Sequence, residues 1–418
     1  MAKQLPEENI SEQHDVVIVG GGPVGLFLGL NLAQKGLDTV VLEAEADINQ
    51  SPRALMYFPI VLNEFEKFGI LDEVVRAGYK NQEGLCFRTT ASGSNKVLAS
   101  IPPGKASQGS IDYGVQLGQP RLAEILRRHA QKYPSFSLQY NTRFVGLEEE
   151  HDAVRLETST PDGKTKYFSA RFVVGCDGAS SPVRKALGIP FEGYTWHDWR
   201  FLAINLRYDF TKYGYPAANH VLDPEDWAVI VRASNVEEGL WRIATGISPD
   251  IPVEEIEKHI PAKLERLLPG PRPLQYELVA VNPYWAHERV AKTYRSGRVI
   301  LCGDAAHVNN PLTALGLTTG LVDVAVLSRL LPQAFTPQHA SSWPRLLDKY
   351  STLRRNDFVN QVQKLCLDGK LRLHSTDPKV VAAREDFFNM LNKNPGFGDF
   401  VAGTMVEKLP DDLDPSLA

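Results

Sequence analysis

The sequence is short of cysteine, of net charge and of long apolar runs, and each shortage excludes a class of protein. Its four cysteines among 418 residues form no CxxC pair, so neither a disulfide scaffold nor a zinc site is expected. The formal net charge of -5 offers no basic surface to nucleic acid or to an anionic membrane. No stretch of about 18 apolar residues stands out, so no membrane-spanning helix is expected.

The N-terminal segment, Met1 to His14, lacks the apolar core of a signal peptide. Together with the scarce, unpaired cysteines, this polar and acidic segment indicates a protein of the reducing cytoplasm. What the chain does have is length and 43% hydrophobic residues, which suffice for roughly two or three domains with a large buried core.

A βαβ unit is predicted between residues 15 and 43. The strand Asp15–Val19 is an almost continuous β-branched run, as in a strand buried on both faces. A helix from Pro23 to Lys35 follows, with proline in its first turn. A second strand, Thr39–Leu42, leads directly into an acidic residue, Glu43. This order of elements is typical of a dinucleotide-binding unit.

The turn between that strand and the helix reads Gly20-Gly21-Gly22-Pro23-Val24-Gly25. Gly20 permits the tight turn, Gly22 lets the backbone approach a pyrophosphate at the helix N-terminus, and Gly25 allows close helix–strand packing. Glu43 is placed to accept hydrogen bonds from ribose hydroxyls and would repel a 2′-phosphate. The unit therefore predicts NAD or FAD rather than NADP, and it does not separate NAD from FAD.

A second glycine-and-acid motif lies far along the chain. The strand Arg298–Cys302 runs into Gly303-Asp304-Ala305-Ala306-His307, and a helix is expected over Leu315–Leu331. This run resembles the GD motif of the FAD-dependent aromatic hydroxylases, the para-hydroxybenzoate-hydroxylase-like (group A) flavoprotein monooxygenases. The resemblance implies that Asp304 binds the ribityl or ribose side of FAD, that Pro311 lies beside the flavin ring, and that the following helix N-terminus faces the flavin carbonyls.

A third match, Phe172–Arg184, resembles the DG motif of the same family, which in relatives lies near the FAD pyrophosphate and the approach of NAD(P)H. Two further residues, Arg53 and Gln119, match an arginine and a glutamine that contact FAD in the family. The motifs and the resemblance together assign to non-covalent FAD the residues Gly20, Gly22, Pro23, Val24, Gly25, Glu43, Ala44, Arg53, Gln119, Asp177, Gly303, Asp304, Pro311, Gly316, Leu317 and Thr318.

The run after the GD motif departs from the family pattern. Thr313 and Ala314 replace small glycines, and Thr318 replaces an asparagine. We expect a stiffer and bulkier loop beside the flavin, with the hydroxyl of Thr318 still able to bond to a flavin carbonyl. The variant is similar to fungal secondary-metabolism hydroxylases.

The run of elements and the resemblance predict an α/β fold. A Rossmann-like FAD-binding domain, with small β insertions, is expected over 1–189 and returns with the GD motif over 286–335. A mainly antiparallel β-sheet domain that binds substrate is expected over 190–285, and a C-terminal helical segment and tail over 336–418.

Plainer interpretations stand beside several of these roles. His307 has no metal-ligand partners at suitable spacing, so a structural or flavin-adjacent role is favoured and no metal is expected. Asp304 is also a residue type for a turn or helix cap, and Arg184 is either a solvated helix charge or close to the cofactor. Most aromatic residues of the inserted sheet are expected in its core. The catalytic group is not identified; the substrate-site candidates are Arg200, Tyr208, Trp227, Trp241 and Arg242.

The resemblance implies a monooxygenase that uses NAD(P)H, FAD and O2. A flavin C4a-hydroperoxide would insert one oxygen atom into an aromatic, phenolic or enol-type molecule, including polyketide-like ones. NAD(P)H, lacking a second Rossmann fold, would bind transiently in a groove. An epoxidase, halogenase or reductase on the same fold, or a non-enzymatic FAD-fold binding protein, stays open as an alternative. The protein is expected to be a monomer or a homodimer.

Overall fold

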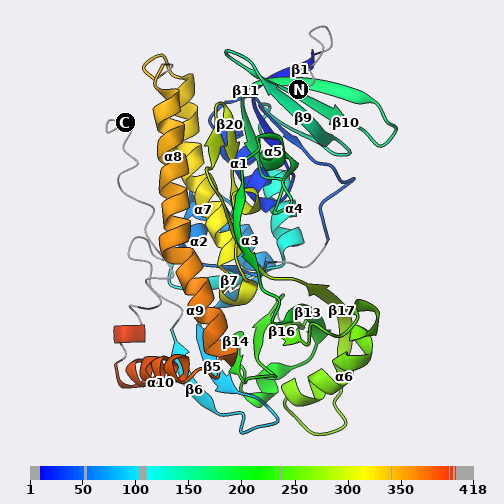
Figure 1. The fold of residues 1–418 in the computed structure, drawn as a ribbon, viewed down its shortest axis with the longest axis vertical. Helices are drawn as coiled ribbons and strands as arrows, with labels where there is room; N and C mark the ends of the chain where they lie inside the picture. Colours follow the sequence, from blue (N-terminus) through cyan, green and yellow to red (C-terminus); the bar gives the residue numbers. More distant parts are fainter. Residues whose placement is uncertain are drawn as a thin grey trace.

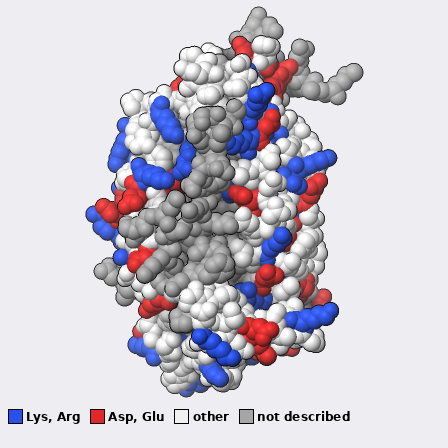
Figure 2. All heavy atoms as spheres, turned by 90° about the vertical axis from the view of Figure 1, so that its left-hand side faces the viewer, with Lys and Arg blue, Asp and Glu red and all other residues white. Residues whose placement is uncertain are grey.

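The computed structural model describes residues 10–50, 54–102, 111–235, 238–339, 341–394, 396–398 and 401. Two lobes, each built on a sheet, lie one above the other, and a long helix near the C-terminus runs past both (Figure 1). Arg53 and most of the tail from Pro395 lie outside the described residues. Figure 2 shows basic and acidic side chains interspersed over the described part of one face, in keeping with the small net charge.

The sheet of the upper lobe contains the predicted βαβ unit. Strands β1 (Ile10–Val19) and β2 (Thr39–Leu42) pair in parallel, and the run Val16–Val19 is buried, as its continuous apolar character requires. The sheet order is β19-β20-β11-β1-β2-β8, with β9 and β10 branching from β11. The added strands are β8 (Phe136–Gln139), β9 (Arg143–Glu149), β10 (Val154–Ser159), β11 (Thr165–Gly175), β19 (Arg295–Ser296) and β20 (Val299–Leu301).

Helices and two small sheets complete this lobe. Helix α1 (Pro23–Gln34) packs between α4 (Gln119–Ala130) and α7 (Leu315–Leu330), because its side chains are apolar on all sides. One three-stranded sheet joins β3 (Met56–Tyr57), β7 (Gly114–Gln116) and β4 (Tyr79–Asn81), and another joins β12 (Phe191–Thr195), β18 (His287–Ala291) and β21 (His307–Val308). The shorter helices are α2 (Pro59–Lys67), α3 (Leu71–Ala77) and α5 (Pro182–Ala186).

Helix α7 corrects one expectation from the sequence. Together with the 3-10 turn that follows it, the segment Leu315–Phe335 has a mean hydropathy of 1.4 and is long and apolar enough to cross a membrane. The expectation that no such segment exists is therefore wrong on length and composition. In the structure 78% of its apolar 18-residue window is buried, because α7 packs against α1, α2 and α8 (Trp343–Asp357).

The sheet of the lower lobe has seven strands in the order β17-β13-β16-β15-β14-β5-β6. Only β14 (Ala218–Leu222) and β5 (Leu85–Thr89) pair in parallel. Both β5 and β6 (Val97–Ile101) come from the segment 1–189, so this sheet is not confined to residues 190–285. The partner of β5, β14, is far away in sequence, and local patterns carry no signal for such pairing. The other strands are β13 (Arg200–Arg207), β15 (Ala228–Arg232), β16 (Leu240–Ile247) and β17 (Glu277–Tyr284).

The two faces of this sheet have different neighbours. We call the face covered by α6 (Ile256–Leu267) the far face; Leu202, Ile204 and Ile243 pack there around the helix. We call the opposite face the near face; Phe201, Trp227 and Val229 pack there against residues of the upper lobe and of the C-terminal helix. Successive residues of one strand alternate between the two faces.

The expected C-terminal helical segment contains one long helix. It consists of α8, a π-helical turn Phe358–Val362 and α9 (Gln363–His374), and it follows α7 before reaching the lower sheet (Figure 1). A further helix, α10 (Pro378–Lys393), covers strand β6 with Phe388 and Leu391.

Candidate active site

The three glycines of the N-terminal turn differ in what surrounds them. A Cβ on Gly20, which has φ +111°, would lie 2.4 Å from the carbonyl oxygen of Cys176, and one on Gly25 would lie 2.0 Å from the oxygen of Gly20. A Cβ on Gly22 would meet nothing within 4 Å. Gly20 and Gly25 are therefore required by the packing of the protein itself. Gly22, at the N-terminus of α1, faces open space where phosphate oxygens fit.

Glu43 lies beside this turn. Its Oε2 accepts a hydrogen bond from the amide of Gly21 at 2.7 Å, and its Oε1 accepts one from the amide of Glu45 at 2.9 Å. Each carboxylate oxygen has a second lone pair, so Glu43 keeps capacity for ribose hydroxyls. Ala44, next along the chain, is half-buried.

The second motif is built around a buried carboxylate on α7. Asp323 accepts hydrogen bonds from the amide of Gly303 at 3.0 Å, from His307 Nε2 at 2.7 Å and from Arg354 Nε at 2.7 Å. Burial alone would raise the pKa of Asp323, but His307 and Arg354 outweigh it and lower that pKa. His307 is stacked on Phe358 at 4.6 Å and is fully buried. It therefore has the structural role that the sequence favoured.

The DG motif contacts the GD motif directly. Arg184 donates hydrogen bonds to the carbonyls of Ala305 at 2.8 Å and Ala179 at 2.9 Å, and its guanidinium covers the ring of Phe191. The side chain is buried, so the interpretation as a solvated helix charge is wrong. Val24, from the N-terminal glycine turn, connects that turn to the GD motif, since it packs against Gly303 and Gly320.

Several buried polar atoms near these motifs, including His307 Nδ1, have no hydrogen-bond partner among the described residues, and three of them are oxygens that a cofactor could reach. These three oxygens are Asp177 Oδ1, Asn309 Oδ1 and Thr318 Oγ1. The second oxygen of Asp177 accepts the amide of Val183 at 2.9 Å, and burial raises the pKa of this carboxyl. Unpaired buried polar groups are rare and costly, so these three atoms fit a polar ligand that supplies partners. Together with the space beside Gly22, they fit a dinucleotide such as FAD.

The remaining predicted cofactor residues are distributed around the same edge of the upper sheet. Asp304 and Pro311 are exposed, Gly316 and Leu317 are half-buried in the first turn of α7, and Gln119 begins α4. Pro23 is the first residue of α1. No group of three metal-ligating side chains is present within the described ranges.

The predicted substrate candidates separate between the two faces of the lower sheet. Trp227 is fully buried on the near face, where Leu312 from the loop after the GD motif and Leu373 from α9 pack with it. Trp241 packs in the far-face core against the ring of Phe210 at 4.9 Å. The geometry therefore retains Trp227 and assigns Trp241 to the core.

Tyr208 also belongs to the far side, where its hydroxyl donates to the carbonyl of Pro269 and its ring stacks on Tyr213. The guanidinium of Arg200 lies 4.4 Å from the ring centre of Trp285. Neither residue is among the near-face cluster around Trp227.

Arg242 and His220 add a charged and a polar side chain to the near face. Arg242 is buried, donates from Nε to Asn205 Oδ1 at 2.9 Å, and has its pKa lowered to about 10 by burial, against the opposing effect of Tyr284. His220 was missed by the sequence analysis, because its strand β14 was not predicted. Burial and the charge of Arg372 lower the pKa of His220 to about 3, so it is a neutral imidazole.

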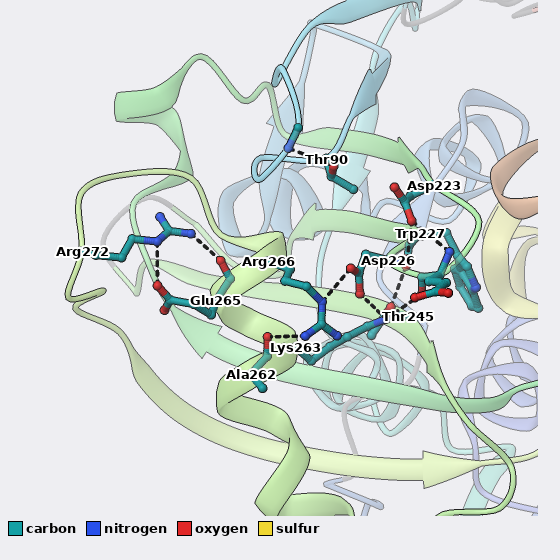
Figure 3. Close-up of polar contacts among 12 residues, drawn as sticks. Thr90, Asp223, Asp226, Trp227, Thr245, Ala262, Lys263, Glu265, Arg266 and Arg272 are labelled. Atoms are coloured by element: carbon teal, nitrogen blue, oxygen red, sulfur yellow. Dashed lines mark hydrogen bonds and ion pairs between the residues drawn. The ribbon is translucent and has the colours of Figure 1, made fainter.

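An ion-pair network, in which Asp226 and Lys263 are buried and Arg266 is exposed, fixes the turn that precedes Trp227 (Figure 3). Asp226 pairs with Lys263 at 2.9 Å and with Arg266 at 2.7 Å, both on α6. On the adjacent strand, Thr245 donates its hydroxyl to the carbonyl of Trp227 at 2.6 Å. The backbone at Trp227 is thus held in place from the opposite side of the sheet, while the indole Nε1 has no partner among the described residues.

A pocket of about 270 Å³ opens beside the DG motif. Basic side chains dominate its polar lining, so it favours an anionic or phosphorylated ligand. The lining residues are Ala179, Ser180, Arg184, Lys185, Phe191, His287, Arg289 and Val308.

Known proteins with the same architecture identify the class. The structure of a p-nitrophenol 4-monooxygenase from Pseudomonas putida DLL-E4 has the same fold. That structure has a TM-score of 0.88 and 34% identity, and the match covers 96% of this chain and 100% of that one. A flavin-dependent monooxygenase in complex with FAD and substrate shares the fold, with a TM-score of 0.76 and 22% identity over 95% of this chain and 72% of that one.

Sequence comparison gives the family. Residues 13–365 match the family described as "FAD binding domain". The para-nitrophenol 4-monooxygenase of Pseudomonas sp. (strain WBC-3) is 38% identical over 82% of this chain and 83% of its own length. The 6-hydroxy-3-succinoylpyridine 3-monooxygenase of Pseudomonas putida (strain DSM 28022 / S16) is 35% identical over 88% and 91%. The chain belongs to this FAD-binding family and is a FAD-dependent aromatic hydroxylase. The similarity to fungal hydroxylases stays a prediction.

Proposed function

We propose that this enzyme hydroxylates a small, single-ring phenolic or enolic substrate, with NAD(P)H as electron donor. The observation that carries the proposal is the near face, where Trp227, Phe201 and Leu312 pack together. The buried Arg242 lies on the same face, where it donates a hydrogen bond to Asn205. Because the side chains on this face are large, we expect it to accept a compact ring rather than a polyketide-like one. The names of both relatives describe hydroxylated or nitrated aromatic rings, which supports this choice.

We assign FAD to the groups left open in the upper lobe. The amides around Gly22 and the α1 N-terminus would hold the pyrophosphate, and Glu43 would hold ribose hydroxyls. Asn309 and Thr318 would bond to the polar edge of the flavin. Bound FAD supplies the activation of O2 and an electrophilic oxygen atom.

The chain's own residues would prepare the substrate. Arg242 would favour the ionised oxygen of a phenol and orient it, because a buried cation stabilises a nearby anion. Trp227 and Phe201 would cover the ring and exclude water. We place NAD(P)H phosphates in the basic pocket beside Lys185 and Arg289, and we expect the enzyme in a reducing cytoplasm as a monomer or homodimer.

The test combines flavin content with isotope incorporation. Purified protein is expected to be yellow and to oxidise NAD(P)H faster when 4-nitrophenol or another small phenol is added. Reaction under 18O2 is expected to place one labelled oxygen in the product, detected by mass spectrometry. Protein that takes up no FAD, or NAD(P)H oxidation without labelled product for any phenol or hydroxypyridine, would overturn the proposal.

A further inference from the structure

The loop Asn309–Ala314 lies between the GD motif and α7, and it contacts two elements that are distant in sequence. On one side is α9, and on the other is strand β18. Its residue Leu312 belongs to the near-face cluster, so the position of this loop determines the shape of the substrate side as well as the cofactor side.

The contact with α9 is made through Cys366 and Gly369. The Sγ of Cys366 lies 2.9 Å from Thr313 Oγ1 and 3.1 Å from Asn309 Nδ2, and its carbonyl accepts from Asn310 Nδ2 at 2.9 Å. One turn along the helix, a Cβ on Gly369 would lie 2.5 Å from the methyl carbon of Thr313. The methyl group therefore fits a notch that exists only because residue 369 is glycine.

The contact with β18 is made through one fully buried carboxylate. Glu288 Oε1 accepts hydrogen bonds from the backbone amide of Asn310 at 3.1 Å and from its side-chain amide at 2.6 Å. Asn310 Oδ1 in turn accepts the amide of Leu312 at 3.2 Å. Burial raises the pKa of Glu288, and the hydrogen bonds from Asn310 oppose that rise. Because both hydrogen bonds come from one loop residue, Glu288 fixes the first half of the loop.

The loop ends in a backbone conformation that needs such support. Ala314 has φ +58°, in the left-handed region where a residue with a Cβ is disfavoured. Strained conformations persist where the surrounding contacts over-determine them. The contacts of Thr313 with Cys366 and Gly369 immediately precede Ala314 and supply that constraint.

We propose that Cys366, Gly369 and Glu288 are positioning residues that clamp the Asn309–Ala314 loop in one place against the bound cofactor and substrate. The proposal rests on the proposed function for its consequence in catalysis, whereas the clamp itself is a property of the protein without ligand. Helix α9 is then part of the active site through this loop and through Leu373, which packs on the near face.

The decisive experiment uses Gly369→Ala, Thr313→Ser and the double variant. Alanine favours helix over glycine, so Gly369→Ala does not weaken α9 itself. It is expected to push Thr313 away, raise amide hydrogen exchange at Leu312 and Ala314 in the protein without FAD, and weaken FAD binding by about tenfold. Thr313→Ser removes the methyl group and keeps the hydroxyl, so the double variant is expected to restore both quantities.

A second pair of variants tests the thiol. Cys366→Ser keeps a partner for Thr313 and Asn309 and is expected to behave like wild type, whereas Cys366→Ala is expected to loosen the loop. In the loaded enzyme, a loosened loop raises the fraction of NAD(P)H that yields hydrogen peroxide instead of product. A folded Gly369→Ala variant with unchanged loop exchange, or a double variant that stays defective, would overturn the clamp. If the wild-type enzyme hydroxylates no phenol or hydroxypyridine, the proposed function is refuted. The exchange measurement on the protein without FAD would still test the clamp.

Discussion

Trp227 and Trp241 are both completely buried, and they lie at neighbouring strands of the same sheet, Trp227 directly before β15 and Trp241 in β16, but they face opposite ways. Trp241 points to α6 and is surrounded by core residues. Trp227 points to the loop after the GD motif and to α9. Residue type and burial are the same in both positions, so neither property identifies the substrate side. Strand register and the element that covers each face decide the role.

The same contrast occurs at the glycine turn. Gly25 is enclosed by the protein, whereas Gly22 faces open space at the start of α1. A residue that the fold requires and a residue that the ligand requires can be three positions apart in one motif. Variants at such matched positions should separate folding defects from binding defects.

The largest expected effect comes from Gly25→Ala compared with Gly22→Ala. The new Cβ at residue 25 would overlap the carbonyl oxygen of Gly20 at 2.0 Å, so we expect loss of stability of more than about 3 kcal/mol and little folded protein. Gly22 has φ -72° and ψ 176°, which any residue adopts, so Gly22→Ala should fold normally and bind FAD at least about tenfold more weakly. Thermal melting and FAD titration measure both. Equal melting temperatures for the two variants would contradict the contrast.

Much of the upper lobe could be predicted because its signals are local. The apolar run Val16–Val19, the turn at Gly20 and the helix from Pro23 are adjacent in sequence, and the structure retains all of them in order. The pairing of β5 with β14 could not be predicted, since it joins residues more than 100 positions apart and neither strand has a distinctive pattern.

A smaller effect is expected from matched tryptophan substitutions on the two faces. Both Trp227→Phe and Trp241→Phe leave a void, and each should lower the free energy of unfolding by about 1–2 kcal/mol. Only Trp227→Phe should also raise the KM for the phenolic substrate, because only that ring faces the site. Denaturant unfolding and steady-state kinetics give the two values. A raised KM for Trp241→Phe with unchanged KM for Trp227→Phe would reverse the assignment of the faces.

The candidate site was only partly predictable for a related reason. The glycines and Glu43 were found because their spacing is constrained by one turn and one strand. Cys366, Gly369 and Leu373 could not be found, because α9 reaches the site only after the chain has passed along α7 and α8 (Figure 1). Their role is defined by contacts with a loop about 55 residues earlier, and no periodic pattern records such contacts.

The smallest expected effect concerns His220, whose pKa is lowered to about 3 in the folded protein by burial and by Arg372. The unfolded chain has a histidine pKa of about 6.5, so between these values only the unfolded state binds the proton. The contribution of the neutral His220 to the free energy of unfolding is fully present above about pH 6.5 and falls as the pH decreases toward 3. From pH 7 to pH 5.5 the loss should be about 1 kcal/mol.

Replacing His220 with glutamine removes the titrating group and should flatten this part of the stability profile. His259, which is exposed on α6, provides the matched control, and His259→Gln should leave the profile unchanged. Urea unfolding at several pH values gives the slope for each variant. If His220→Gln keeps the wild-type slope, the imidazole is not the neutral, buried group that β14 places against the site, and the near face would have to be assigned without it.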